Sequence, residues 1–327
     1  MVIKQPCREI SCPAAAIDRQ SEAEFGYTNE TLARPHGKDG LARMMTEFAV
    51  ETRTDFVFAE HDGMTLLGDL YRPKGRAKAP VLVALHGGGW QIGDRKFYWN
   101  WGCYLARHGY AVFATEYRLM KPGESTWPGV VCDCRAAVQF VRGEAAELGV
   151  DPDRIGLIGD SAGAHLAALV ALAGDESPFA GEAAITTDVK VVIGFYGVYD
   201  MLAQWEHDQI ARPLDPITEK LLGGPPMKSR KRFFEASPIS YATIDKNKTR
   251  FLLIYGREDD IVDRATQSER FLTALKQAGF FARTIVVPGA GHFWSVDPVD
   301  EPGSFGAYAG PKMLRFLATA FPQESVE

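Results

Sequence analysis

The chain has 327 residues, of which 46% are hydrophobic and 24% charged, and these values exclude disordered, collagen-like and fibrous classes of protein. The 42 acidic and 36 basic residues leave a formal net charge of −6 and are spread along the chain, so we expect no nucleic-acid partner and no anionic membrane surface. No apolar run reaches the roughly 18 residues that a membrane span needs. The expected partner is a small molecule.

The composition of residues 1–50 differs from that of the rest of the chain. Ser, Glu, Asn, Pro and Gly are frequent at first, and Leu41, Met44, Met45 and Phe48 then recur at helical spacing. We therefore expect an N-terminal arm or cap segment that ends in a short amphipathic helix. This arm is predicted either to complete a pocket or to form a contact in a homodimer.

The cysteines and the start of the chain bear on its location. The cysteines are Cys7, Cys12, Cys103, Cys132 and Cys134. Five is an odd number in a chain large enough to fold without disulfides, which predicts reduced thiols in a cytoplasm. The first residues, with Lys4, Arg8 and Glu9, are unlike a secretory signal. No second Cys or His pair stands at a zinc-finger spacing, so no metal site is predicted.

From residue 51 to residue 327 the chain reads as one α/β domain. Apolar β-branched runs alternate with helical patterns, which predicts a largely parallel sheet flanked by helices. The eight expected strands are Phe56–Ala59, Thr65–Tyr71, Val81–His86, Ala111–Thr115, Ile155–Gly159, Val189–Phe195, Phe251–Gly256 and Thr284–Val287. The expected helices include Trp99–His108, Cys132–Leu148, Ala162–Ala173 and Arg264–Gly279. An Asp62-Gly63 pair between the first two strands predicts an antiparallel hairpin.

Residues 200–239 contain no strand pattern, and four prolines divide them into short pieces. We expect this insertion, at the edge where strands end, to form a small cap over a site. Its basic run Lys228–Arg232 is predicted to be a solvated helix face.

The motif Gly159-Asp160-Ser161-Ala162-Gly163 lies where the strand Ile155–Gly159 gives way to a helix. A nucleophile on so sharp a turn needs tiny neighbours, because its backbone is strained and passes close to adjacent strands. The N-terminal amides of the following helix would stabilise negative charge that forms near Ser161. We therefore predict that Ser161 is a nucleophile.

The motif His86-Gly87-Gly88-Gly89-Trp90 follows the third expected strand. Consecutive glycines leave N–H groups that an incoming oxygen can approach without obstruction. The amides of Gly88, Gly89 and Ala162 are therefore the predicted oxyanion hole. We expect His86 to hold this loop by hydrogen bonding and not to act as a base.

Serine is a weak nucleophile at neutral pH, so it needs a base and a carboxylate that orients the base. Asp259 lies in a loop after the seventh expected strand and is the predicted acid, with Asp260 and Asp263 as alternatives. Asp263 is also a natural N-cap for the following helix.

His292 lies on a glycine-flanked loop after the eighth expected strand and is the predicted base. The order Ser, Asp, His, with each residue after a strand, favours it over the other histidines. Four of these lie in polar or turn contexts, and His165 follows Ser161 by one helical turn. The other histidines weighed for this role are His36, His61, His108, His165 and His207.

On these motifs the chain resembles the α/β-hydrolase fold, and more narrowly the HGGG-type carboxylesterases related to hormone-sensitive lipase and the feruloyl-esterase-like and formamidase-like enzymes. The matching stretches are His86–Trp90, Glu116–Leu119, Trp127–Pro128, Asp151–Ile155, Gly159–Gly163, Ser237–Pro238, Gly256–Val262 and Gly291–His292. Two stretches depart from the lipase-like pattern: Met120-Lys121-Pro122 stands where Ala-Pro-Glu is usual, and Gln91-Ile92-Gly93-Asp94 is closer to the feruloyl-esterase-like branch.

The resemblance implies a serine carboxylesterase with Ser161, Asp259 and His292 as its triad and with Gly88, Gly89 and Ala162 as amide donors. Such an enzyme cleaves small to medium carboxylic esters in two steps through an acyl-enzyme and uses no cofactor.

Four aromatic residues fall on loops near the expected site or in the insertion. Trp90, Trp205, Phe293 and Trp294 are predicted to line an acyl or alcohol pocket, and the alternative is that they are simply core or cap packing.

Two other functions are weighed beside ester hydrolysis. The same residues would also serve an arylformamidase-like amide hydrolase. A non-catalytic small-molecule receptor with this fold would be expected to have lost a triad member, and all three are present. A peptidase is disfavoured because the length leaves no room for a large gating domain.

Overall fold

The computed structural model describes residues 47–61, 63–180 and 185–321. The predicted arm helix with Leu41, Met44 and Met45 lies outside the described residues, and so do Cys7 and Cys12. Phe48 is described, and its backbone N–H donates to the carbonyl of Arg107 (2.8 Å).

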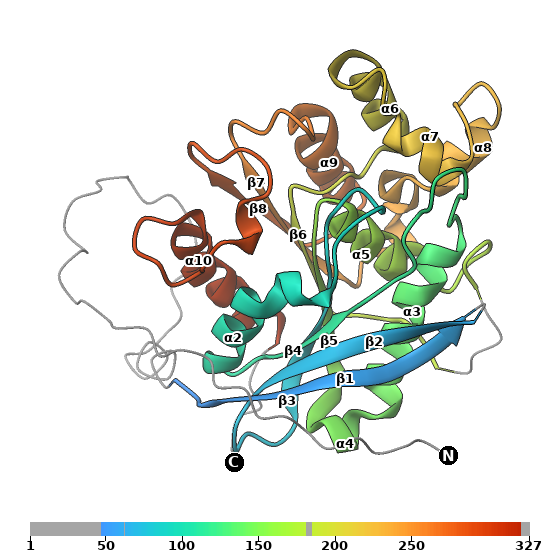
Figure 1. The fold of residues 1–327 in the computed structure, drawn as a ribbon. Helices are drawn as coiled ribbons and strands as arrows, with labels where there is room; N and C mark the ends of the chain where they lie inside the picture. The colour runs from blue at the N-terminus through green and yellow to red at the C-terminus, as the bar shows by residue number, and fades with distance from the viewer. Residues whose placement is uncertain (1–46, 62, 181–184, 322–327) are drawn as a thin grey trace.

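In the described part of the chain, eight strands form one sheet in the order β1-β2-β4-β3-β5-β6-β7-β8 (Figure 1). The strands are β1 (Val50–His61), β2 (Met64–Pro73), β3 (Ala79–Leu85), β4 (Ala111–Thr115), β5 (Val150–Asp160), β6 (Val191–Phe195), β7 (Arg250–Gly256) and β8 (Ala282–Val287). The pairs β1–β2 and β2–β4 are antiparallel and all others are parallel, so the predicted hairpin and the largely parallel sheet are confirmed.

The helices fall between the strands as the sequence predicts. They are α2 (Trp99–Arg107), α3 (Gly129–Gly143), α4 (Ala145–Leu148), α5 (Ala162–Ala173), α6 (Met201–Ala211), α7 (Ile217–Leu222), α8 (Arg230–Glu235), α9 (Arg270–Gln277) and α10 (Phe305–Ala320). Short helical turns are η1 (Arg95–Tyr98), η2 (Pro238–Tyr241), η3 (Ile244–Lys246), η4 (Ala265–Glu269) and η5 (Trp294–Val296). The expected helix Cys132–Leu148 is two helices, because Glu144 leaves helical geometry at φ −98° and ψ 16°.

The strands carry a core on each face of the sheet. Along β3, Val81, Val83 and Leu85 face one core and Leu82 and Ala84 face the other, as the two-residue period of a strand requires. Helices α3, α5 and α9 cover the first face, and α2 and α10 cover the second. All residues of β3 are buried, which is typical of a parallel strand covered on both sides.

The carboxyl ends of β3, β5, β7 and β8 meet at one edge of the sheet, because these strands run parallel. The glycine loop, the Ser161 motif and the loops that carry Asp259 and His292 all begin at this edge. Residues 200–239 form α6, α7 and α8, which lie together beyond it (Figure 1). The Trp205 indole N–H donates to Glu219 (2.7 Å) and so ties α6 to α7.

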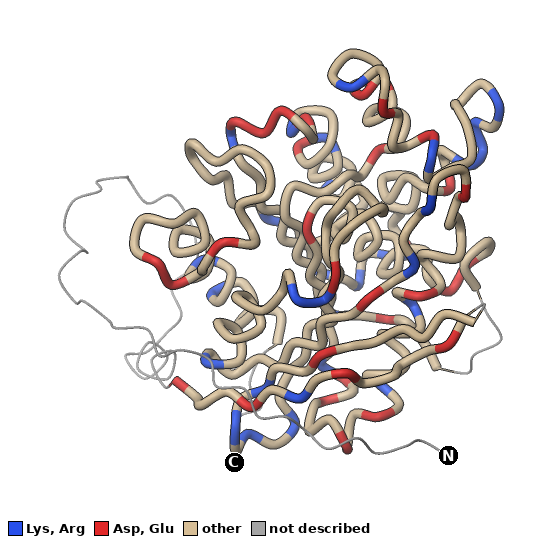
Figure 2. Tube along the Cα trace, viewed as in Figure 1, with Lys and Arg blue, Asp and Glu red and all other residues tan. Residues whose placement is uncertain are grey.

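Charge is distributed as the composition suggests. Figure 2 shows acidic and basic residues interspersed along the described chain. The run Lys228–Arg232 leads into α8, and Lys231 is exposed and pairs with Glu235 at 3.4 Å. Among the described residues, no helix has both the length and the apolar character needed to cross a membrane.

The prediction that all thiols are reduced is wrong for Cys103, which is disulfide-bonded in the structure. Cys132 and Cys134 are free, and Cys134 is fully buried in α3. Burial raises the pKa of the Cys134 thiol well above its usual value, which makes this cysteine unreactive.

Candidate active site

Ser161 occupies the strained turn between β5 and α5. Its backbone has φ 50° and ψ −116°, a conformation that side-chain-bearing residues rarely adopt. A Cβ atom on Gly163 would lie 1.9 Å from the carbonyl oxygen of Leu85 in β3, and one on Gly159 would lie 2.4 Å from the backbone of Gly163. The two glycines are therefore required by close approach of the chain, which is the reason that the sequence motif predicts.

The structure brings Ser161, His292 and Asp259 into one hydrogen-bonded row. The His292 Nε2 atom lies 3.0 Å from Ser161 Oγ, and Nδ1 lies 2.8 Å from an Asp259 carboxylate oxygen. The side chains of His292 and Asp259 are 2% and 1% exposed. Since the carboxylate can only accept, Nδ1 carries the proton and Nε2 is free to accept the serine proton. Tyr196 packs against the imidazole at 4.3 Å.

The loop after β7 selects Asp259 over its two neighbours. One carboxylate oxygen of Asp259 accepts the N–H groups of Ile261 and Val262 (both 3.0 Å), which leaves the other oxygen directed at His292. Asp263 instead accepts the N–H of Thr266 (2.9 Å) at the start of the helical turn η4, whose N-cap residue is Arg264 and not Asp263 as expected. The contact that the structure gives Asp260 is between its carbonyl and His207.

The glycine loop lies against the serine turn. The Gly87 N–H donates to the Asp160 carboxylate (2.9 Å), which ties this loop to the residue before Ser161. Burial raises the pKa of Asp160 to about 6. Within the described residues, neither Gly88 nor Gly89 donates its N–H in a hydrogen bond. Ala162 is the first residue of α5, so its N–H has no acceptor within the helix.

His86 holds the glycine loop by hydrogen bonding, as expected, and is not part of the row formed by Ser161, His292 and Asp259. Its Nδ1 atom donates to the Gly87 carbonyl (2.7 Å), and its ring stacks on Tyr117 at 4.3 Å. The Tyr117 hydroxyl donates to the His86 carbonyl (2.7 Å). Burial lowers the pKa of His86 to about 4, so it is neutral at physiological pH.

We expect Gly88→Ala to lower kcat/KM on an ester by about 10²–10³. Gly88 has φ +116°, and a Cβ atom there would lie 2.1 Å from the Ile92 carbonyl oxygen, so the loop must move and its amides must shift. Steady-state kinetics measures the loss. Gly75→Ala is the matched control, since Gly75 also has a positive φ (+80°) but has no atom within 4 Å of an added Cβ. Unchanged kinetics in Gly88→Ala would show that the loop does not hold the oxyanion.

His165 connects three parts of the site. Its Nδ1 atom accepts the Trp90 indole N–H (3.2 Å), and its Nε2–H donates to the Ala236 carbonyl (2.7 Å) at the end of α8. The glycine loop and the insertion are therefore both fixed to α5. Burial lowers the pKa of His165 to about 4, because a charged imidazole has no water around it here.

The buried His165 should make the protein less stable in acid. Its folded pKa of about 4 lies below the usual histidine pKa of 6.5, so the unfolded chain binds the proton more tightly. The contribution of neutral His165 to the free energy of unfolding is complete above pH 6.5 and is lost as the pH falls toward 4. The loss is on the order of 3 kcal/mol. Urea unfolding across that pH range should show a smaller fall in His165→Gln than in the unchanged protein. Equal pH dependence in both proteins would contradict this assignment.

A small pocket of about 30 Å³ opens beside Ser161. It is lined by Gly89, Trp90, Ser161, Ala162, Val198, Gln204, Asp208, Arg212, Ile217, Ile261 and Val262. Gln204, Asp208 and Arg212 were not predicted from the sequence. Their four-residue spacing, along α6 and into the residue that follows it, was the available signal, but nothing in the sequence says which face of that helix turns toward Ser161.

Of the four predicted aromatic pocket residues, only Trp90 lines this pocket among the described residues. Trp294 is 3% exposed and packs edge-on against Phe195, which fits the alternative of core packing. Trp205 is turned toward Glu219 and joins α6 to α7. Phe293 is 58% exposed and stands beside the His292 ring at 4.6 Å, outside the pocket lining. Loop position alone could not separate these environments.

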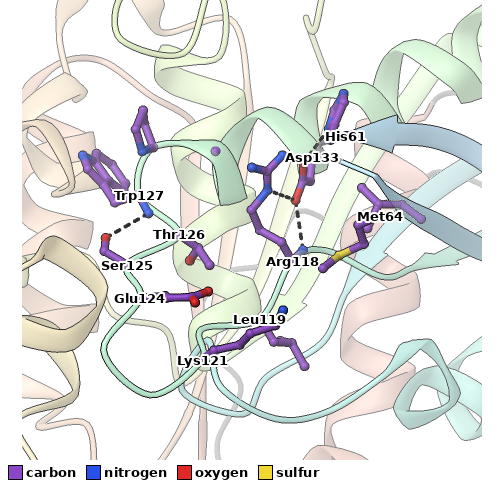
Figure 3. Close-up of a pocket in the computed structure, with 13 residues that line it drawn as sticks. His61, Met64, Arg118, Leu119, Lys121, Glu124, Ser125, Thr126, Trp127 and Asp133 are labelled. Atoms are coloured by element: carbon purple, nitrogen blue, oxygen red, sulfur yellow. Dashed lines mark hydrogen bonds and ion pairs between the residues drawn. The ribbon is translucent and has the colours of Figure 1, made fainter.

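A larger cavity, of about 460 Å³, is lined by 13 residues, which Figure 3 draws as sticks. Its walls include the tip of the β1–β2 hairpin, the loop after Arg118 and the start of α3. Here the fully buried Asp133 binds Arg118 (2.7 Å) and His61 (2.6 Å). These groups satisfy one another, and neither Ser161, Asp259 nor His292 lines this cavity.

Comparisons with known proteins agree with this geometry. The BD-FAE family model matches residues 68–275, which is more than half of the chain. Esterase LipQ of Mycobacterium tuberculosis is 35% identical over 210 residues, covering 62% of this chain and 47% of that protein. The probable carboxylic ester hydrolase LipM of the same organism is 31% identical over 202 residues, covering 61% and 45%. The chain thus spans about half the length of the curated relatives it matches.

A solved structure shares the fold over most of both chains. The thermophilic esterase Est2 of Thermogutta terrifontis superposes with a TM-score of 0.65 at 25% identity, covering 84% of this chain and 93% of that one. The strand order, the strained serine turn, the three-residue row and the family match point the same way. The chain has the α/β-hydrolase fold and belongs to the BD-FAE family.

Proposed function

We propose that this protein is a serine carboxylesterase that hydrolyses small to medium carboxylic esters through an acyl-enzyme. The observation that carries the proposal is the row from Ser161 Oγ to His292 Nε2 (3.0 Å) and from His292 Nδ1 to Asp259 (2.8 Å). The relatives named esterases and the family match support it. A non-catalytic receptor has no need for such a row, or for a strained backbone at the serine.

The first step transfers the acyl group to Ser161. His292 Nε2 takes the serine proton as Oγ attacks the ester carbonyl, and Asp259 stabilises the imidazolium that forms. The oxyanion lies toward the backbone N–H groups of Gly88, Gly89 and Ala162. Among the described residues, none of these three N–H groups donates to another acceptor. His292 then gives the proton to the departing alcohol. Water, activated by the same imidazole, releases the acid and restores Ser161. These residues complete the chemistry without a cofactor.

The insertion of residues 200–239 is assigned as a cap in this proposal. It supplies Gln204, Asp208, Arg212 and Ile217 to the pocket wall, and His165 fixes its end to α5. The narrow pocket favours a short group on the side of the ester that enters it.

The test is a panel of p-nitrophenyl esters of increasing acyl length, assayed beside aryl formamides and feruloyl esters. The expected result is saturable ester hydrolysis and labelling of Ser161 by a fluorophosphonate probe, located by peptide mass spectrometry. Faster turnover of the formamides than of every ester would favour the arylformamidase-like reaction. Absence of both turnover and labelling would reject a serine hydrolase.

Two wider proposals come from the sequence. A homodimer, with residues 1–50 in the contact, would give twice the chain mass in multi-angle light scattering. The second proposal is a cytoplasmic location. The disulfide at Cys103 weakens it, because the expectation of reduced thiols was one of the reasons for this location. Cell fractionation, with thiol alkylation before lysis, would test this location directly.

A further inference from the structure

One face of α6, together with Arg212 directly after this helix, gives the pocket a polar wall. Gln204, Asp208 and Arg212 are four residues apart, and all three line the cavity that Ser161 opens into. Gln204 is 4% exposed and Asp208 is 1% exposed. The lining also includes the apolar residues Val198, Ile217 and Val262. Buried polar groups are costly unless they are paired, so each of the three must be accounted for.

Asp208 and Arg212 account for each other. The Arg212 Nε atom lies 3.1 Å from the carboxylate of Asp208, one helical turn earlier. Asp208 also accepts a hydrogen bond from the Gln204 amide (2.9 Å). This ion pair therefore presents no net charge to the pocket, so we expect the bound substrate group to be uncharged.

Gln204 is left with one unmatched atom. Its Nε2 donates to Asp208 (2.9 Å) and to the Ile261 carbonyl (3.1 Å), which uses both of its N–H groups. Turning the amide over would set its oxygen against two other oxygens, so the orientation is fixed. Within the part of the chain that the structure describes, Oε1 is buried and has no hydrogen-bond partner.

An acceptor of this kind lowers the affinity for apolar groups and raises it for a group that donates a hydrogen bond. We propose that Gln204 is a specificity-determining residue whose Oε1 accepts a hydrogen bond from a hydroxyl on the ester chain that enters the pocket. The volume of about 30 Å³ limits that group to a short hydroxylated chain. This inference rests on the proposed esterase function and adds the class of substrate.

The experiment compares matched ester pairs that differ in one hydroxyl. The acyl-side pair is p-nitrophenyl butanoate and p-nitrophenyl 3-hydroxybutanoate, and the alcohol-side pair is ethyl butanoate and 2-hydroxyethyl butanoate. Each kcat/KM is divided by the alkaline hydrolysis rate of the same ester, which removes intrinsic reactivity. The unchanged protein should prefer the hydroxylated member of one pair by about tenfold, and that pair identifies which side of the ester the pocket holds.

Gln204→Met keeps the length of the side chain and removes the acceptor, so the preference should fall to about onefold. The ratio is taken within one preparation, so partial misfolding of the variant cancels. Gln209→Met is the matched control, because Gln209 lies on the exposed side of the same helix and should leave the ratio unchanged.

Two results would overturn the inference. One is that the unchanged protein shows no preference in either pair, and this outcome does not depend on how any variant folds. The other is that the preference persists in Gln204→Met. Failure of the unchanged protein to cleave any of the four esters would instead count against the proposed esterase function.

Discussion

Replacing Ser161 with alanine should abolish ester turnover, with a loss in kcat on the order of 10⁶. The hydroxyl is the atom that His292 contacts at 3.0 Å and the one that would form the acyl-enzyme, so no neighbouring group can substitute for it. Long incubations of a chromogenic ester with a high concentration of the variant measure the residual rate. Labelling by the fluorophosphonate probe should disappear in the same variant.

The matched control is Ser240→Ala, a serine outside the pocket lining, which should retain full turnover. Since alanine relieves none of the strain at φ 50°, Ser161→Ala should unfold at nearly the same urea concentration as the unchanged protein. A Ser161→Ala protein that still hydrolyses esters at a substantial rate would mean that the nucleophile lies elsewhere.

Asp259→Asn should lower kcat by about 10⁴ through the tautomer of His292. One oxygen of Asp259 accepts the N–H groups of Ile261 and Val262, so the asparagine oxygen must stay there and its NH₂ group must face His292. Nδ1 would then have to accept, which places the imidazole proton on Nε2. That nitrogen can no longer take the proton of Ser161.

The comparison variants for this prediction are Asp260→Asn and Asp263→Asn. Asp260→Asn should keep nearly full activity, and Asp263→Asn should cost stability at the start of η4 more than it costs turnover. The kcat values of the three variants, measured side by side, identify the acid. Full activity in Asp259→Asn together with a large loss in Asp260→Asn would show that the loop rearranges when substrate binds.

The elbow at Ser161 could be read from the sequence because its cause is local. Gly159 and Gly163 are dictated by backbone atoms only 2.4 Å and 1.9 Å from where a side chain would begin, and glycine is the only residue that fits. His292 and Asp259 could be placed because each follows a strand of a parallel sheet, and such strands end at one edge. In both cases a residue type and its position relative to a strand carry the information.

The sequence did not reveal which aromatic side chains line the pocket. Trp90 and Trp294 both follow a strand by a few residues, yet Trp90 lines the pocket and Trp294 fills the core beside Phe195. The difference depends on the direction that each side chain takes from its loop. Side-chain direction in an irregular segment is set by neighbours remote in sequence and leaves no periodic pattern to read.

The sequence by itself determined the eight strands, the hairpin and the identity of the candidate nucleophile and base, because strand periodicity and glycine spacing are properties of neighbouring residues. Only the tertiary structure decided which acid faces His292, which face of α6 lines the pocket, and that Gln204 keeps an unmatched acceptor there. Those outcomes depend on contacts between residues 33 positions apart in one case and 57 in another. Such contacts form only when the whole sheet has brought its loops to one edge.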